Sequence, residues 1–122
     1  MLFARRLFLF AAGYGFLALL PQYALLDKNG RDFPPPINHP EYYFGFIGVA
    51  VAWQAAFLVI ARDPVRYRLL MLPAIGEKAL FGIPAVVLFA LGRLGTPMFA
   101  AGSVDLLLGV LFAVAFVRTP KQ

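Results

Sequence analysis

Four apolar runs, each about 20 residues long, constrain the fold of this chain more than any other feature of its sequence. They cover residues 7–26, 42–61, 69–92 and 97–117. An α-helix needs about 20 apolar residues to cross the hydrocarbon core of a bilayer. Each run therefore predicts a transmembrane helix, and only connectors and tails remain of the 122 residues. We expect an all-α protein, a single integral membrane domain that folds as a four-helix bundle.

The composition supports the lipid bilayer as the main partner of this chain. Hydrophobic residues make up 61% of it and charged residues only 14%, whereas soluble domains are about 45–50% apolar. The chain has no cysteine and a single histidine, His39. Disulfides, thiolate metal sites and bis-histidine haem are thereby excluded. We expect no cofactor and no metal site.

The basic residues predict the orientation in the membrane. The net charge is +5, but the Lys and Arg residues lie in short clusters between the apolar runs, which is typical of the positive-inside rule and not of a nucleic-acid surface. On one side lie Arg5, Arg6, Arg62, Arg66, Arg68, Arg118 and Lys121. On the other side lie Lys28, Arg31 and Arg93. The distribution predicts an up-down-up-down bundle with both termini cytoplasmic, in a cell membrane such as the bacterial inner membrane.

The first run also has some features of a signal peptide. Arg5 and Arg6 are followed by apolar residues, as in a secretory signal. However, the apolar stretch exceeds the usual length of about 7–15 residues, and no small-residue cleavage motif follows it. We therefore expect a retained helix.

The connectors carry turn and capping signals. Residues 27–41 form the long outer loop, in which Asn29-Gly30 indicates a turn and three prolines from Pro34 an extended segment. Pro40 is suited to the first turn of the second helix. On the inner side, Asp63-Pro64 predicts an N-cap and the start of a short interfacial helix over residues 64–72. Only about four residues join the last two helices, so these helices should be neighbours.

Polar side chains inside the predicted spans are the candidate functional residues. Each ionisable residue at mid-bilayer costs about 2.5–3.5 kcal/mol on insertion scales. Five polar residues lie at overlapping depths: Tyr14, Gln54, Glu77, Lys78 and Asp105. We expect Lys78 to reach Asp105 across the contact between the last two helices. Glu77 projects about 100° away from Lys78 on the same helix, so we expect it to face Gln54 or Tyr14.

Two interpretations of this polar layer remain open. It can fix the register of the four helices, because polar groups join membrane helices, or it can bind a ligand or an ion. Pro73 and Pro84 free two backbone carbonyls on either side of Glu77 and Lys78. Broken helices beside charges occur in transporters, yet prolines are also common in membrane helices in general.

Three stretches resemble a known group of membrane proteins. They are Glu77-Lys78-x-x-Phe81-Gly82, Asp105-Leu106-x-x-Gly109-x-Leu111-Phe112, and Tyr42-Tyr43-x-Gly45-Phe46 through Trp53-Gln54. Together with the four-helix layout, they resemble small bacterial DoxX-like membrane proteins. The resemblance covers the last three helices and implies a compact four-helix bundle; most members of the group have no assigned activity.

The sequence leaves three functions open. The first is a non-catalytic subunit or scaffold in a homo-oligomer or a larger membrane complex, which fits the small size and the absence of a catalytic motif. The second is a binding protein or transporter for a small lipophilic or charged molecule that uses Glu77, Lys78 and Asp105. The third is an enzyme acting on lipid or sterol substrates, for which the layout of four-helix sterol isomerases offers a parallel.

Overall fold

The computed structural model describes residues 2–121, and all the regular secondary structure over that range is helical. It contains five α-helices: α1 (Leu2–Leu19), α2 (Leu26–Asp32), α3 (Pro40–Arg62), α4 (Met71–Ala90) and α5 (Thr96–Arg118). Short 3₁₀ segments over Leu20–Ala24 and Arg68–Leu70 extend α1 and precede α4. Residues 2–121 form no β-strand.

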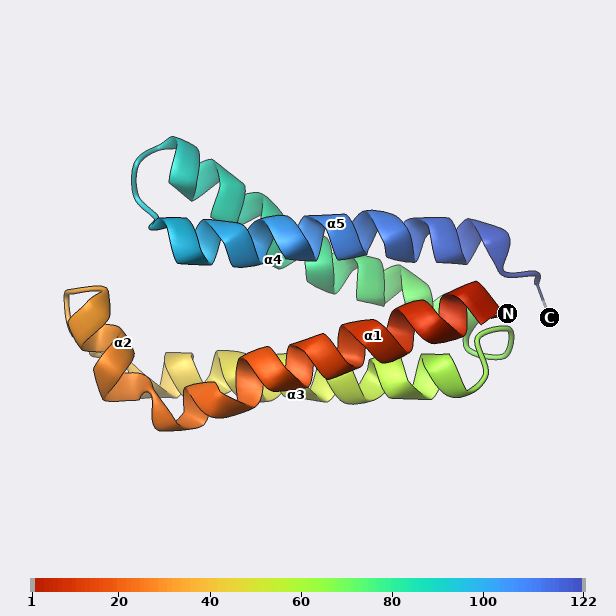
Figure 1. Ribbon diagram of the computed structural model, residues 1–122, viewed down its shortest axis with the longest axis horizontal. Helices are drawn as coiled ribbons and strands as arrows, with labels where there is room; N and C mark the ends of the chain where they lie inside the picture. Colours follow the sequence, from red (N-terminus) through yellow and green to blue (C-terminus); the bar gives the residue numbers. More distant parts are fainter. Residues whose placement is uncertain (1, 122) are drawn as a thin grey trace.

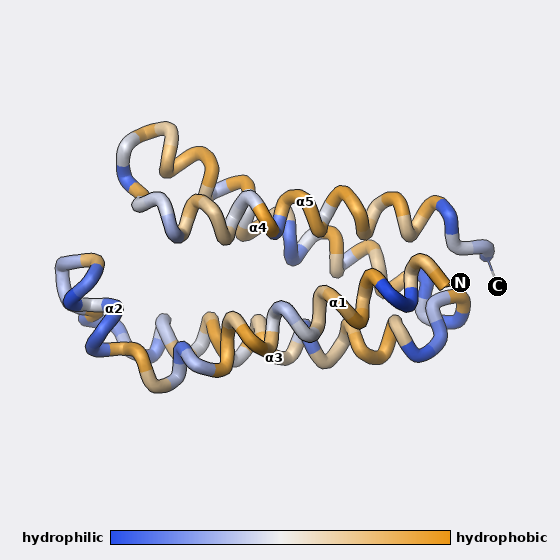
Figure 2. The backbone as a smooth tube through the Cα atoms, viewed as in Figure 1, coloured by the Kyte–Doolittle hydropathy of each residue, from blue (hydrophilic) through white to orange (hydrophobic). Residues whose placement is uncertain are grey.

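Four of the helical segments are long and apolar enough to cross a membrane. They are Leu2–Ala24, Pro40–Arg62, Arg68–Ala90 and Thr96–Arg118, each of 23 residues. At about 1.5 Å per residue, such a segment exceeds the hydrocarbon thickness of about 30 Å. Figure 2 shows the hydrophobic residues along these helices and the hydrophilic ones gathered at both ends of the molecule. Four helices with the length and apolar character of membrane spans are therefore present, with boundaries a few residues away from the predicted ones.

The segment predicted as an outer loop differs from the prediction, because residues 27–41 are not a continuous loop. They include most of α2, and Asn29-Gly30 lies inside this helix instead of in a turn. The Asn29 amide donates hydrogen bonds to Oε1 of Gln22 (2.7 Å) and to the hydroxyl of Tyr43 (2.9 Å). Tyr43 in turn donates to the backbone carbonyl of Gln22 at 2.7 Å. These tertiary hydrogen bonds override the local turn preference of the dipeptide.

The prediction of an interfacial helix over residues 64–72 is wrong. The chain forms a turn after Asp63, then the short 3₁₀ segment, and α4 begins only at Met71. Asp63 does act locally: its Oδ1 accepts the backbone N–H of Arg66 at 3.3 Å. Because α4 begins at Met71, Pro73 lies in its first turn, where the missing N–H breaks no helical hydrogen bond. Pro84 is the proline inside α4.

The long helices are arranged as two pairs. Helix α1 lies along α3 and helix α4 lies along α5, as Figure 1 shows, so the last two helices are neighbours as predicted. Both chain ends lie at one end of the molecule, which we call the terminal end; the opposite end carries α2 (Figure 1). In the α4–α5 pair, Gly82 and Gly102 allow the helices to approach closely. A Cβ at Gly102 would lie 2.4 Å from that of Ala85.

The hydrophobic core lies in the half of the bundle nearest the terminal end. Its centre is a trio of fully buried rings, Phe8 of α1, Phe57 of α3 and Phe112 of α5. The centroids of Phe8 and Phe112 are 4.3 Å apart, and those of Phe57 and Phe112 are 5.1 Å apart in an edge-on arrangement. Met71 and Ala74 add the face of α4. All four long helices meet here, and this meeting fixes the position of the polar residues just beyond it.

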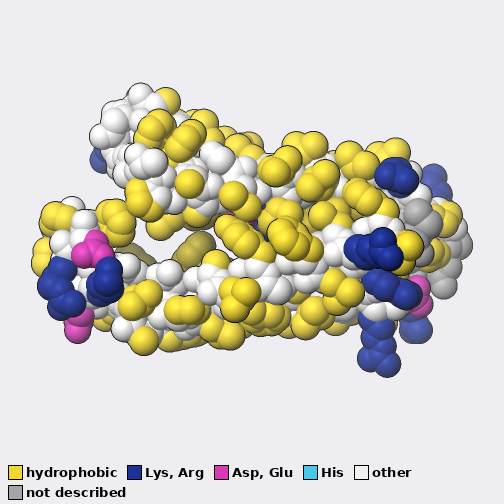
Figure 3. All heavy atoms as spheres, viewed as in Figure 1, with side chains coloured by type: hydrophobic (Ala, Val, Ile, Leu, Met, Phe, Trp, Pro, Cys, Tyr) yellow, Lys and Arg dark blue, Asp and Glu magenta, His cyan; other side chains and the backbone are white. Residues whose placement is uncertain are grey.

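Toward the α2 end the two helix pairs separate (Figure 1). Figure 3 shows a hollow between them, bordered by hydrophobic side chains. The pairs touch again at the far end, where the ring of Phe33 lies close to Gly95 in the connector between α4 and α5; a Cβ at Gly95 would be 3.9 Å from this ring. The hollow is thus bounded by the core on one side and by the Phe33–Gly95 contact on the other.

Candidate functional site

The centre of the candidate site is Lys78, a lysine that is almost completely buried. Its side chain is 3% exposed. Its Nζ lies 3.4 Å from Oδ1 of Asp105 on α5 and 3.7 Å from Oε2 of Glu77 on α4. Gly109 lies against the stem of this lysine, since a Cβ at Gly109 would be 3.2 Å from the Cβ of Lys78. The predicted contact between Lys78 and Asp105 is confirmed.

Glu77 lies differently from the expectation. The angle of about 100° between successive helical residues suggests that Glu77 and Lys78 face different neighbours. The flexible four-carbon stem of the lysine nevertheless brings Nζ within ion-pair distance of Glu77. Instead of pairing with Gln54 or Tyr14 as expected, Glu77 has Lys78 as its charged neighbour, and these two residues and Asp105 form one charged triad.

The triad is unbalanced in charge and in hydrogen bonds. It places two carboxyl groups around one ammonium group, and the three side chains are only 3–17% exposed. Lys78 donates a hydrogen bond to Asp105. Oε2 of Glu77 is buried and accepts no hydrogen bond within the described part of the chain. A buried carboxylate oxygen without a donor is costly, so Glu77 is the incompletely satisfied member.

The aromatic core supports Lys78 from a third direction. Its Nζ lies 5.2 Å from the centroid of the Phe57 ring on α3. A cation over an aromatic face is attracted by the ring quadrupole, and the attraction is larger when both groups are desolvated. The sequence analysis did not single out Phe57. The available signal was its position one helical turn after Gln54, which is consistent with the same inward face.

Gln54 belongs to the other helix pair. This residue is 1% exposed, and its amide donates to the carbonyl of Ala50 in its own helix at 2.8 Å. Its Oε1 is buried and has no donor within residues 2–121. It packs against Gly15 of α1, where a Cβ would lie 1.9 Å from this oxygen. Gln54 therefore packs into the α1–α3 contact, and no hydrogen bond joins it to the triad.

Tyr14 also lies apart from the triad in its direct contacts. It is half-buried, packs against the hydrophobic core and stacks on Phe10 with a centroid separation of 6.5 Å. None of the hydrogen bonds found between described residues involves Tyr14. The structure therefore brings together Glu77, Lys78 and Asp105, and it leaves Gln54 and Tyr14 in the neighbouring α1–α3 pair.

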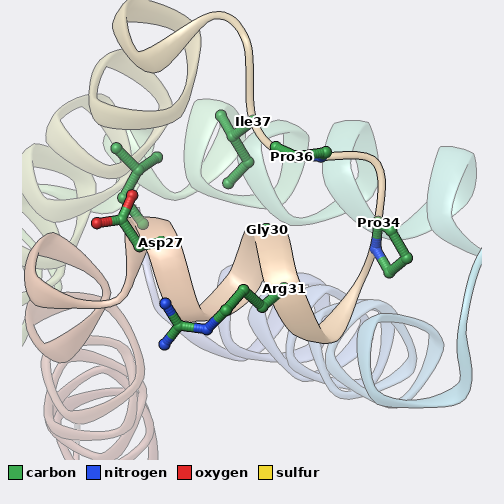
Figure 4. A pocket seen from close by; sticks show the side chains of 7 residues that line it. Asp27, Gly30, Arg31, Pro34, Pro36 and Ile37 are labelled. Carbon is green, nitrogen blue, oxygen red and sulfur yellow. The ribbon is translucent and has the colours of Figure 1, made fainter.

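A second hollow lies at the α2 end. It has a volume of about 470 Å³ and is lined by residues of α2 and of the proline-rich segment that follows. In Figure 4, Asp27, Gly30 and Arg31 belong to α2, while Pro34, Pro36 and Ile37 lie on the segment returning toward α3. Gly30 permits this close return, because a Cβ there would be 3.3 Å from the backbone of Pro36. The hollow is open and does not include the charged triad.

The two carboxyl groups of the triad suit the binding of a cation. Among residues 2–121, no three His, Cys, Asp or Glu side chains are grouped to hold a metal ion. The fold and the site together are those of a helical protein with four helices apolar enough to span a membrane. Between these helices lies a charged triad with two carboxyl groups and one ammonium group. Comparison with protein-family models, with curated proteins and with solved structures gave no match.

Proposed function

We propose that this chain is an integral membrane protein that binds a small lipophilic cation at Glu77, Lys78 and Asp105. The observation that carries the proposal is the buried Oε2 of Glu77, which has a charge neighbour but no hydrogen-bond donor. Two carboxylates around one ammonium leave an excess negative charge in an apolar interior. Such a charge must be neutralised by a proton or by a second cation. A ligand ammonium group would supply both the charge and the missing donor.

The hollow between the helix pairs favours a ligand with an apolar body. It is bordered by hydrophobic side chains (Figure 3), and the contact of Phe33 with Gly95 joins the two pairs at its far end. A molecule would thus enter sideways from the lipid, where lipophilic amines concentrate. Inorganic cations would have to shed their water without a matching set of ligands. An alkylammonium group attached to an apolar chain fits both the triad and the hollow.

The proposal includes the membrane topology. We place the four long helices in an up-down-up-down order with both termini in the cytoplasm, in a cell membrane of the bacterial inner-membrane type. Two observations support this arrangement. The positive charges concentrate at the terminal end, as the positive-inside rule requires, and both chain ends lie at that end in Figure 1. The weak resemblance to DoxX-like proteins is compatible with this layout.

Binding of a fluorescent lipophilic amine tests the proposed site. The probe is a dansyl-labelled long-chain alkylamine, and its N-acetylated, uncharged form is the control ligand. The purified protein in detergent should bind the charged probe, and Glu77→Gln should weaken that binding at least about tenfold. Glu41→Gln, at an exposed carboxyl on the first turn of α3, should leave it unchanged. Equal binding of the acetylated probe, or unchanged binding by Glu77→Gln, would refute the proposal.

A second function, that of a non-catalytic subunit or scaffold, is favoured by three glycines that have free space beside them. Gly13 of α1, Gly45 of α3 and Gly76 of α4 have no neighbouring atom within 4 Å of an added Cβ. Small residues on a lipid-facing surface allow a helix of another subunit to approach closely. This function predicts a homo-oligomer or a larger complex after extraction in mild detergent. A protein that remains monomeric and without partners at native expression would contradict it.

A further inference from the structure

The terminal end carries a groove that is distinct from the charged triad. It lies along one side of α1, has a volume of about 470 Å³ and is lined by Leu2, Phe3, Arg6, Leu7 and Phe10. Four of these five side chains are apolar. Leu2 and Phe10 are 59% and 64% exposed, so the groove faces outward, toward the lipid that surrounds a membrane-spanning α1.

Two guanidinium groups lie at this groove. Arg6 is one of the lining residues. Arg118, the last residue of α5, holds its guanidinium carbon 4.8 Å from the centroid of the Phe3 ring. No hydrogen bond or ion pair between described residues occupies Arg6. Its charge is therefore available to a ligand.

The neighbouring arginines are used differently. Nε of Arg5 donates to the carbonyl of Ala61 near the end of α3, at 3.2 Å. Nε of Arg68 donates to the carbonyls of Phe116 and Thr119 at the end of α5, at 3.1 and 2.8 Å. These two arginines satisfy carbonyls that a helix end leaves free. Arg6 and the exposed Arg62 make no such bond between described residues, and of these two only Arg6 lines the groove.

The surrounding charge selects an anion. The terminal end carries most of the Lys and Arg residues of the chain, and Asp63 is the acidic residue beside them. Figure 3 shows several Lys and Arg side chains gathered at that end. Arg6 stands at the edge of the apolar run, and Phe10 lies one helical turn deeper. From Arg6 inward, the groove presents charge and then apolar surface, which is the order of headgroup and acyl chain in a phospholipid, while Leu2 and Phe3 line it on the outer side of Arg6.

We propose that this groove is a binding site for an anionic diacyl phospholipid. The guanidinium of Arg6 binds the phosphodiester, in the forked geometry that arginine offers to phosphate. Arg118 adds a second positive charge beside Phe3. One acyl chain lies over Leu7 and Phe10. The site does not depend on the proposed cation site, which lies deeper in the bundle.

Native mass spectrometry of the whole protein in detergent tests the proposal. The probes are phosphatidylglycerol and phosphatidylcholine with identical acyl chains. The unmodified protein should retain phosphatidylglycerol in preference to phosphatidylcholine. Arg6→Gln should reduce this retention at least about fivefold, and Arg6→Lys should restore part of it, because charge remains while the fork is lost. Arg62→Gln, at an exposed arginine of the same end that does not line the groove, is the matched control.

A second variant separates a lipid from a free phosphate. Phe10→Ala removes exposed apolar surface without touching the charge, and it should also lower retention of phosphatidylglycerol. Millimolar inorganic phosphate should not displace the lipid from the unmodified protein. The proposal is overturned if Arg62→Gln loses as much lipid as Arg6→Gln, since attraction would then be a property of the whole basic end. It is also overturned if both phospholipids are retained equally, or if phosphate alone competes.

Discussion

Gly15 of α1 lies directly against the Gln54 side chain of α3: a Cβ added at Gly15 would be 1.9 Å from Oε1 and 2.3 Å from Cδ of Gln54. Both residues are buried, and Gln54 is held in place by its hydrogen bond to Ala50. This contact couples the close approach of α1 and α3 to a polar side chain inside the bundle. The glycine is required here by proximity, because its backbone is ordinary helix.

The first prediction follows from that contact. Gly15→Ala should destabilise the protein by about 1–3 kcal/mol, the usual cost of forcing extra volume into a packed interior. The free energy of unfolding in detergent is the quantity to measure. Gly13→Ala is the matched control on the same helix, because no atom lies within 4 Å of its added Cβ. Removing the obstructing side chain with Gln54→Ala should recover part of the stability of Gly15→Ala. Equal stability of the Gly13 and Gly15 variants would show that α1 and α3 pack differently.

The pairing of Lys78 with Asp105 gives the second prediction. Lys78→Met leaves two buried carboxyls without their cation, and Asp105→Leu removes the hydrogen-bond acceptor of the lysine. Breaking one partner of a buried ion pair costs about 3–5 kcal/mol, whereas replacing both is much less harmful. Each single variant should therefore lower the unfolding temperature in detergent, and the double variant should recover part of the loss. Purely additive losses in the double variant would mean that the two side chains are not coupled.

Topology is the third prediction. Reporter fusions placed after Arg66 and at the C-terminus should both be found in the cytoplasm, because the Lys and Arg residues concentrate at that end. A fusion inserted within residues 27–41 should be found outside. Insertion after Asp32, where α2 ends, leaves the helices intact. The reverse pattern of reporter activity would reject the orientation.

The four spans could be predicted from the sequence because the length of an apolar run depends on the bilayer and hardly on tertiary contacts. The start of α1 was placed too late, since Arg5 and Arg6 interrupt the apolar pattern although arginine is a good helix former. Helix α2 was missed because tertiary contacts, and not its local sequence, hold it in place. Its Asn29 is fixed by hydrogen bonds to Gln22 and Tyr43, and such long-range contacts leave no local signal.

The candidate site could be predicted only in part. The contact between Lys78 and Asp105 could be predicted from their similar depths along two helices, because a short connector makes α4 and α5 neighbours. The place of Glu77 depended on how the flexible lysine bends, which the helical angle does not determine. Gln54 was separated from the triad by its contact with Gly15. Which small residue meets which side chain is decided by the packing of whole helices and is not written in any one segment.

The last prediction concerns Glu77, whose buried Oε2 has no hydrogen-bond donor among the described residues. Glu77→Gln removes the excess carboxyl and leaves Lys78 and Asp105 as a balanced pair. The amide keeps the shape of the side chain, so the free energy of unfolding should change by less than about 1 kcal/mol or rise. This outcome contrasts with Lys78→Met, although the two residues are adjacent.

In the absence of a ligand, a proton on Glu77 most simply neutralises the triad, because Asp105 already accepts a hydrogen bond from Lys78. A lipophilic carbodiimide, which modifies protonated carboxyls in apolar surroundings, should therefore label Glu77 in preference to Asp105. Peptide mass spectrometry would locate the label. Labelling of Asp105 instead, or a loss of stability in Glu77→Gln as large as in Lys78→Met, would show that Glu77 is the fully paired carboxylate of the triad.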